Sequence, residues 1–195
     1  MNWGKAWLNY KKIDCKEETK LLEKIYYFQE DPIIVNAAAE LETALTKMLG
    51  ISVISRRIEK GEEANLPSGV ILKAEESSSL AKEGYRITRA ENKIFIEGKE
   101  PAGVLYGVFH LIRLVGCGES IEKLAIEQAP SNPNRMLNHW DNIDGSIERG
   151  YAGKSIFFDQ ENILLNDRTK DYARLCASVG INGVVINNVN VKGAA

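Results

Sequence analysis

The sequence predicts an α/β protein: a small sandwich in which helices cover one face of a single sheet, followed by a βαβ unit. Strand-like and helix-like segments alternate over the first 128 residues. Residues 128–134, QAPSNPN, contain two of the five prolines and almost no apolar side chain, which indicates a boundary between two parts of the chain. Beyond it, one helix-like segment separates two strand-like runs. The second run, GVVIN, is continuously apolar, as parallel strands covered on both faces are.

The first half of the sandwich is expected to begin with a short strand at 5–10 and a charged, helix-like stretch at 17–28. Pro32 then introduces a β-branched run at 33–35. The next apolar side chains are spaced three and four residues apart, which places them on one face of a helix that Gly50 ends. These side chains are Ala38, Leu41, Leu45 and Met48.

A loop is expected over 57–68, a buried strand over 69–74 and a second loop over 75–82. Apolar and charged side chains then alternate on both sides of the dipeptide Glu91–Asn92. This alternation predicts a β-hairpin with one face in water.

The sandwich is expected to end with a helix from Pro101 to Val115, stopped by Gly116, because proline suits the first turn of a helix. A last strand could follow at 124–126. The inward stripe of the helix consists of Ala102, Leu105, Phe109 and Ile112.

In the second part, strands are expected at 136–139 and 183–187, with a helix at 170–179 between them. Two parallel strands cannot stand alone. The side chains expected to face inward from the helix are Tyr172, Leu175, Cys176 and Val179.

The composition excludes several classes of function. A net charge of −2 provides no basic field for nucleic acid, and no run approaches the ~18 consecutive apolar residues of a membrane span. The N-terminus shows no secretory signal, and the three cysteines have neither zinc-site spacing nor a disulfide framework. We therefore expect a cytoplasmic protein with no cofactor, no metal, no nucleic-acid partner and no membrane contact.

Polar side chains follow both strands of the βαβ unit, at the end where parallel α/β folds place their sites. An aromatic face can stack on a pyranose while Asp and Asn hydrogen-bond its hydroxyls, so the first tip suits a sugar. Loops of this kind are polar in any case and Asn favours turns, so a structural role stays open. The candidates are His139, Trp140, Asp141 and Asn142 after the first strand, and Asn187, Asn188 and Asn190 after the second.

Two cations, Arg149 and Lys154, follow in a glycine-spaced segment and would suit an anionic sugar; a solvated hairpin with surface charges is the alternative. A phosphate loop is excluded because Glu148 stands where that motif requires a glycine. Glu148 is also the most plausible acid, since Asp144 belongs to a turn dipeptide and Asp141 is better explained as a hydroxyl acceptor.

Three stretches carry a family resemblance. NHWDNIDGSIERGYAGKSIFF and DYARLCASVGINGVVINNVNV resemble the opening of the catalytic barrel in family 67 glycoside hydrolases, the α-glucuronidases. GKEPAGVLYGVFHLIRLVG is similar to the helix that closes the N-terminal α/β domain of this family and of the β-hexosaminidases, which share that accessory domain. The resemblance implies an accessory domain at 1–128, a linker at 129–134 and the start of an incomplete (β/α)8 barrel at 135–195.

The resemblance also implies an activity: inverting release of glucuronic or 4-O-methylglucuronic acid from glucuronoxylan-derived oligosaccharides, without metal. It assigns no catalytic residue, because the family's acid and base carboxylates lie on later barrel strands, and the chain alone is expected to be inactive. Trp140 matches the aromatic wall of the uronic-acid pocket. The expected substrate-binding residues are His139, Trp140, Asp141, Asn142, Glu148, Arg149, Asn187 and Asn188.

Two further expectations stay open. A rival function is a non-catalytic carbohydrate-binding or structural domain, with an aromatic patch formed by Trp3, Trp7 and Tyr10. Residues 136–137 and 184–186 should either pack onto the N-terminal domain or expose an apolar edge through which the chain self-associates.

Overall fold

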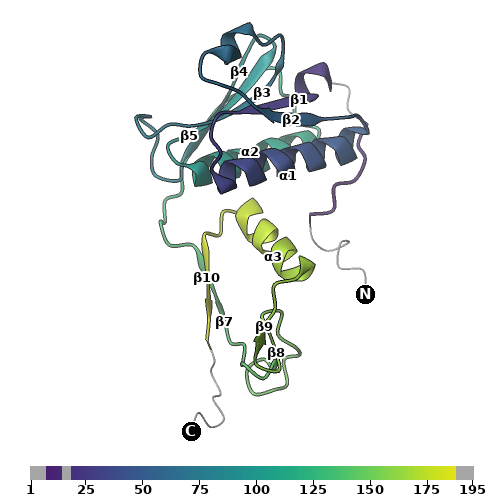
Figure 1. Cartoon of the computed structure of the whole chain (residues 1–195), viewed down its shortest axis with the longest axis vertical. Coiled ribbons are helices and arrows are strands. Elements are labelled where there is room, and N and C mark those ends of the chain that lie inside the picture. The colour runs from purple at the N-terminus through teal and green to yellow at the C-terminus, as the bar shows by residue number, and fades with distance from the viewer. Residues whose placement is uncertain (1–7, 15–18, 188–195) are drawn as a thin grey trace. The chain divides into compact units, whose positions relative to one another are not determined.

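A computed structural model describes residues 8–14 and 19–187. The chain divides into two compact units, one comprising Tyr10–Ser131 and the other containing the described residues from Asn132 onward. The first unit is an α/β sandwich and the second is built around a βαβ unit (Figure 1). The predicted fold class is therefore confirmed, whereas the domain boundaries inferred from the sequence stay a prediction.

The sandwich contains one six-stranded mixed sheet with the order β2-β1-β3-β5-β4-β6. The first four strands in this order pair in parallel, and β4 pairs antiparallel with both of its neighbours. The predicted buried strand, hairpin and last strand are confirmed as β3, β4–β5 and β6. The strands are β1 (Lys24–Tyr27), β2 (Ile54–Arg57), β3 (Gly69–Ala74), β4 (Tyr85–Ala90), β5 (Lys93–Gly98) and β6 (Ala125–Gln128).

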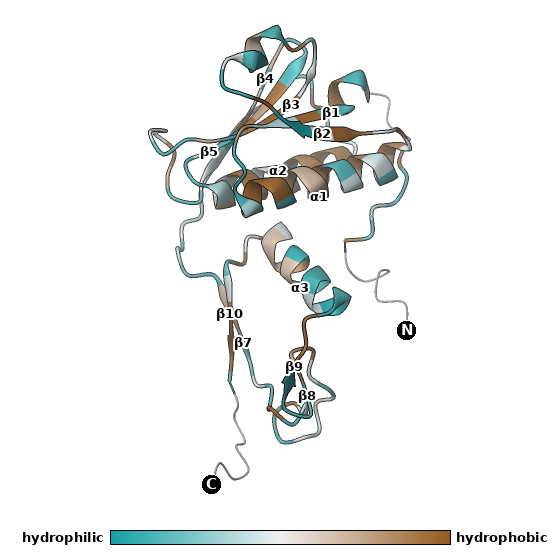
Figure 2. Ribbon diagram, viewed as in Figure 1, coloured by the Kyte–Doolittle hydropathy of each residue, from teal (hydrophilic) through white to brown (hydrophobic). Residues whose placement is uncertain are grey.

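Two helices, α1 (Pro32–Leu49) and α2 (Pro101–Gly116), cover one face of this sheet (Figure 1). Apolar residues concentrate on these helices and on the strands beside them (Figure 2). Burying them is the main favourable term in the stability of the unit. The largest side chains of this core that are fully buried include Ile34, Leu41, Leu45, Ile87, Ile94, Ile96 and Leu111.

The other face of the sheet has a smaller core. Tyr26 and Ile71 are partners in the β1–β3 register, and the segment between β2 and β3 covers them with Ile58 and Leu66. This segment contains the short 3-10 helix η3 (Glu62–Asn65). The loop expected over 57–68 is thus correct for most of its length, and it is a packed loop.

The N-terminal expectations are partly wrong. The stretch expected to be helical contains the 3-10 helix η2 (Thr19–Leu22) followed by strand β1, and the run at 33–35 forms the first turn of α1. That turn forms because the Asp31 carboxylate accepts hydrogen bonds from the backbone N–H groups of residues 33 and 34, at 2.8 and 3.4 Å, directly before a proline.

Two smaller expectations also change. Residues 8–10 are not in a strand, and the rest of the strand expected at 5–10 lies outside the described residues, as do Trp3 and Trp7 of the proposed aromatic patch. The hydroxyl of Tyr10 donates to the carboxylate of Glu40. Gly116 is the last helical residue of α2 and not its stop, because Cys117 forms the cap.

A buried polar group joins α2 to the edge of the sheet. The hydroxyl of Tyr85 donates to Oε1 of Gln128 at 2.7 Å, so it accepts from the Nδ1–H of His110, also at 2.7 Å. Burial, and then the charge of Arg113, lower the pKa of His110 from its ordinary 6.5. The imidazole is therefore neutral in the folded protein at neutral pH.

We expect the sandwich to lose stability under mildly acidic conditions. Because the pKa of His110 is lower in the folded than in the unfolded chain, its contribution is present above pH 6.5 and is lost as pH falls through the folded value. Urea unfolding of wild type and His110→Gln, measured between pH 7.5 and 5, should show a shallower pH dependence for the variant. Parallel pH profiles would contradict this assignment.

The second unit contains the predicted βαβ arrangement. Strand β7 (Met136–His139) pairs in parallel with β10 (Gly183–Ile186), and helix α3 (Asp167–Ser178) connects them. A short hairpin, β8 (Phe158–Asp159) and β9 (Asn162–Ile163), lies within the polar connection and was not predicted. No helix in the described part of the chain is both long and apolar enough to cross a membrane.

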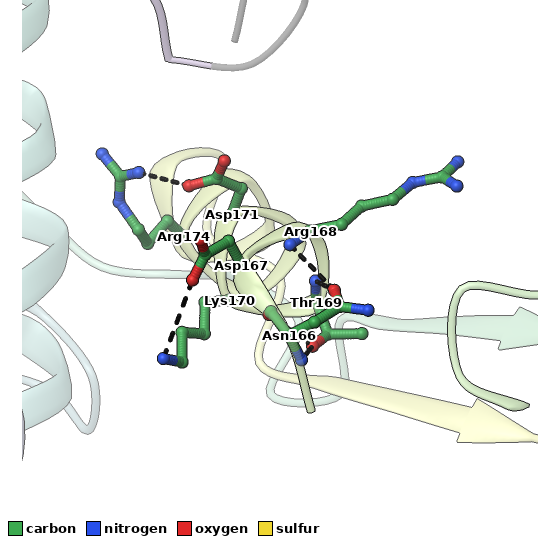
Figure 3. A network of polar contacts seen from close by, with 7 residues as sticks. All are labelled: Asn166, Asp167, Arg168, Thr169, Lys170, Asp171 and Arg174. Carbon is green, nitrogen blue, oxygen red and sulfur yellow. Dashed lines mark hydrogen bonds and ion pairs between the residues drawn. The ribbon is translucent and has the colours of Figure 1, made fainter. Parts of the chain in front are cut away.

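Helix α3 begins three residues earlier than expected because Asn166 caps it. The side-chain oxygen of Asn166 accepts from the N–H groups of Arg168 and Thr169, and the Thr169 hydroxyl accepts from the Asn166 N–H (Figure 3). Within the helix, the half-buried side chains of Asp171 and Arg174 form an ion pair at 2.6 Å.

Fewer side chains of α3 are buried than the spacing of its apolar residues predicted. Cys176 is buried, but Val179 is 68% exposed because it lies after the last helical turn and caps it. The apolar residues of β7 and β10 are exposed as well, although full cover on both faces was expected. They are Met136, Leu137, Val184, Val185 and Ile186.

Candidate functional site

The segment after β7 folds back on itself into a compact tip. The Trp140 carbonyl accepts from the Glu148 N–H at 2.7 Å, and the Ser146 carbonyl accepts from the Asn142 N–H at 2.8 Å. At the turn, Asp144 accepts from both the N–H and the hydroxyl of Ser146, at 2.9 and 2.6 Å. Gly145 has a φ of 87°, which glycine adopts without strain. These bonds fix residues 140–148, here called the β7 tip.

Asn142 braces the tip from inside. Its side chain is buried, and its amide donates to the Ser146 hydroxyl at 2.9 Å and to the Glu148 carbonyl at 2.7 Å. The amide donors of Asn142 therefore bind the loop that they shape. A ligand would meet a surface whose backbone this residue holds in place.

Trp140, in contrast, is accessible to water. It is 49% exposed, whereas its neighbours Asp141 and Asn142 are each only 3% exposed. A large aromatic ring in contact with water, on a backbone held by buried polar neighbours, is a typical platform for the apolar face of a sugar. This arrangement could stack a pyranose ring beside the end of β7.

His139, the last residue of β7, lies in a cluster of rings. Its Nε2 lies 2.5 Å from the hydroxyl of Tyr172 on α3, and its Nδ1 lies 3.8 Å from Oδ1 of Asp141. The ring of Phe157 packs edge-on at 5.0 Å between centroids. The buried hydroxyl of Ser155 accepts from the Phe157 N–H at 2.9 Å and fixes the backbone that carries this ring.

Glu148 is the last residue of the tip, and Arg149 follows it directly. Glu148 adopts a left-handed φ of 53°, which is strained for a side chain of this size. Its carboxylate accepts a hydrogen bond from Tyr151 and thereby raises the pKa of that phenol. Arg149 is exposed. Lys154, five residues later, is also exposed, and its backbone forms a β-bridge with Ser146.

The strand β10 brings the second predicted tip to the same end of the sheet. The Asn187 N–H donates to the His139 carbonyl at 2.8 Å, and its side-chain amide donates to Oδ1 of Asn138. Asn188 and Asn190 lie outside the described residues. The structure thus places Asn187 beside the β7 tip.

Sequence reasoning missed three residues of this site: Tyr172, Phe157 and Ser155. Tyr172 was expected only to face inward from its helix, and its hydrogen bond joins residues 33 positions apart. The sequence carried a partial signal for Phe157, as one of two adjacent aromatics after a polar loop. In the described part of the chain, no group of three or more His, Cys, Asp or Glu side chains could hold a metal ion.

Comparison with protein families gives two adjacent matches. The family model described as glycosyl hydrolase family 67 N-terminus matches residues 6–111, and the model of the glycosyl hydrolase family 67 middle domain matches residues 114–195. The βαβ unit and the β7 tip lie within the second match.

Curated relatives match along nearly the whole chain. The probable alpha-glucuronidase A of Aspergillus terreus is 34% identical over 96% of this chain, and the alpha-glucuronidase of Hypocrea jecorina is 32% identical over 95% of it. The chain spans 24% of the length of each of these relatives.

Solved structures share the fold at low sequence identity. A family GH115 4-O-methyl-alpha-glucuronidase is 15% identical, with a TM-score of 0.54 over 84% of this chain and 25% of its own. A GH20 exo beta-N-acetylglucosaminidase from Vibrio harveyi is 16% identical, with a TM-score of 0.53 over 84% of this chain and 22% of its own.

The two family matches together extend from residue 6 to residue 195, interrupted only at residues 112 and 113, and the curated relatives align over the same length. The chain belongs to glycosyl hydrolase family 67.

Proposed function

We propose that this chain functions as part of an α-glucuronidase, and that the β7 tip binds the uronic acid of a glucuronoxylan-derived oligosaccharide. Family membership and the names of the curated relatives support this activity. The βαβ unit would be the opening of a (β/α)8 barrel, whose sites lie at the carboxyl ends of the strands. A cytoplasmic location, expected from the sequence, stays a prediction.

One observation carries the proposal: Trp140 is half exposed, whereas Asp141 and Asn142 on the same backbone are buried. Stacking of a sugar needs an accessible aromatic face on a rigid support, because a mobile ring would lose conformational entropy on binding. The hydrogen bonds of the β7 tip provide that support.

The positive charge that follows the β7 tip in the sequence suits a uronic acid. Arg149 is exposed directly after the tip, and a guanidinium can bind a carboxylate through two parallel hydrogen bonds. A neutral pyranose would gain only the stacking energy. The tip should therefore prefer glucuronate to glucose.

The 195 residues alone are expected to bind and not to hydrolyse. Inverting hydrolysis needs an acid and a base carboxyl about 6.5–9.5 Å apart on opposite sides of the bond. Among the described carboxylates of the tip, Asp141 lies buried beside His139, Asp144 caps its own turn and Glu148 binds Tyr151. Turnover of an aldouronic acid above a buffer blank would contradict this expectation.

Binding can be tested through the tryptophan side chains. The chain has three tryptophans, so its proton–nitrogen NMR spectrum should contain three indole N–H signals, of which loss in Trp140→Phe assigns one. Titration with D-glucuronate should shift the Trp140 signal saturably, and D-glucose should shift it much less. An unchanged Trp140 signal at high glucuronate concentration would refute the proposal.

The exposed apolar strands predict self-association of the isolated chain. Met136 and Val185 are 52% and 41% exposed on a pair of parallel strands that ordinarily pack on further strands. Light scattering should show a mass that rises with concentration, and Val185→Lys should suppress the rise. A constant monomer mass without binding of an apolar dye would contradict this prediction.

A further inference from the structure

The surroundings of His139 define which of its ring nitrogens carries the proton. Nδ1 lies 3.8 Å from the Asp141 carboxylate, whose side chain is 5% exposed, and a buried carboxylate favours an N–H over a lone pair on the facing atom. A neutral imidazole has a single N–H. With that proton on Nδ1, Nε2 is an acceptor.

The hydroxyl of Tyr172 lies where it can donate a hydrogen bond to Nε2 of His139. Its hydroxyl lies 2.5 Å from Nε2 of His139. Burial, and then the Cys176 thiol and the Asp141 charge, raise the pKa of Tyr172, so the hydroxyl keeps its proton at neutral pH. The hydrogen-bond order is therefore Tyr172 O–H to Nε2, and Nδ1–H towards Asp141.

We propose that Tyr172 is a positioning residue for sugar binding: it fixes the tautomer and orientation of His139, and through this ring it holds the β7 tip. The proposal rests on the proposed function of the tip. It gives His139 a supporting role in place of the direct sugar contact expected from the sequence, because both ring nitrogens face protein groups.

The mechanical consequence follows from the order of residues. His139 directly precedes Trp140. Rotation of the imidazole would therefore break its contact with the Asp141 carboxylate and shift the backbone that carries the indole. The edge-on rings of Phe157 and Tyr172 resist this rotation, with centroids 5.0 and 5.4 Å from that of His139. Without the Tyr172 hydroxyl, the ring keeps these packing contacts and the longer 3.8 Å contact of Nδ1 with Asp141.

The tautomer can be measured directly, because the chain has only two histidines. At about pH 8.5, where an ordinary imidazole is neutral, a long-range proton–nitrogen NMR spectrum should show His139 protonated on Nδ1 alone in the wild type. Tyr172→Phe should replace this state by a mixture of tautomers. A wild-type ring protonated on Nε2, or a His139 pattern unchanged in Tyr172→Phe, would overturn the proposal, and the wild-type result needs no variant to fold.

The matched control is Tyr85→Phe, which removes a hydroxyl bound to the other histidine, His110. Each variant should change the signals of its own histidine only. Glucuronate affinity, measured by the Trp140 indole shift, should fall about three- to ten-fold in Tyr172→Phe, as for loss of one hydrogen bond, and should not change in Tyr85→Phe.

The outcomes separate the two proposals. Unchanged glucuronate affinity in Tyr172→Phe, together with an altered His139 tautomer, would overturn the positioning role. A wild-type chain without glucuronate affinity would overturn the proposed function of the tip, and the NMR spectrum would still decide whether Tyr172 fixes the His139 ring.

Discussion

Replacement of Gly103 by alanine is expected to unfold the α/β sandwich or to cost at least about 3 kcal/mol of stability, at the upper end of the overpacking range. A Cβ at this position would lie 2.2 Å from the Gly84 carbonyl oxygen and 3.1 Å from its carbonyl carbon. Both are backbone atoms, so no side chain can rotate away. The first turn of α2 would have to move away from the loop that precedes β4. This movement would disturb the core in which Leu111 and Ile96 are buried.

The control lies on the same helix. A Cβ at Gly116 would meet only the Met48 sulfur, at an ordinary 3.4 Å, and alanine is more favourable than glycine in a helix by about 0.5–1 kcal/mol. Gly116→Ala should therefore be neutral or slightly stabilising. Urea unfolding followed by circular dichroism compares the two variants. Wild-type stability for Gly103→Ala would show that α2 does not approach the loop this closely.

Replacement of Trp140 by alanine is expected to remove most glucuronate binding while leaving the fold intact. Large aromatic contacts at the centre of a binding surface commonly contribute about 2 kcal/mol, which corresponds to roughly a 30-fold loss of affinity. The folding cost should be small because half of the side chain is already in water. Isothermal titration with glucuronate measures the change.

Trp140→Phe separates stacking from packing in this experiment. Phenylalanine retains an aromatic face of smaller area, so its affinity should fall between those of wild type and Trp140→Ala. Arg149→Met should weaken glucuronate binding and leave any glucose binding unchanged. Equal glucuronate affinity for wild type and Trp140→Ala would show that the sugar does not stack on this indole.

The parts of the fold that the sequence predicted are those with a local pattern. The hairpin β4–β5 alternates, β10 is an apolar run, and β7 begins with two apolar residues directly after the proline-containing linker. β1 and β2 were missed because their structure depends on distant partners. β2, ISRR, is an edge strand with mostly exposed side chains, so no periodicity identifies it, and β1 is fixed by pairing with β2 and β3.

In the candidate site, too, the features with a local pattern were predictable and those that depend on distant contacts were not. Trp140 and its neighbours were predictable because they follow a strand end directly, and a polar tip with an aromatic residue is unusual for a core. The separate roles of the individual residues within the tip were not predictable. Asn142 donates into its own loop, and His139 contacts a tyrosine 33 residues away, so both roles depend on tertiary contacts.

Amide hydrogen exchange with and without saturating D-glucuronate tests most directly whether the β7 tip is the sugar site. Exchange should slow at residues 139–151, where the N–H groups of Asn142 and Glu148 bond within the tip, and should not change in the strands of the sandwich. Protection confined to Tyr10–Ser131 would contradict it and would favour a carbohydrate-binding role of the α/β sandwich.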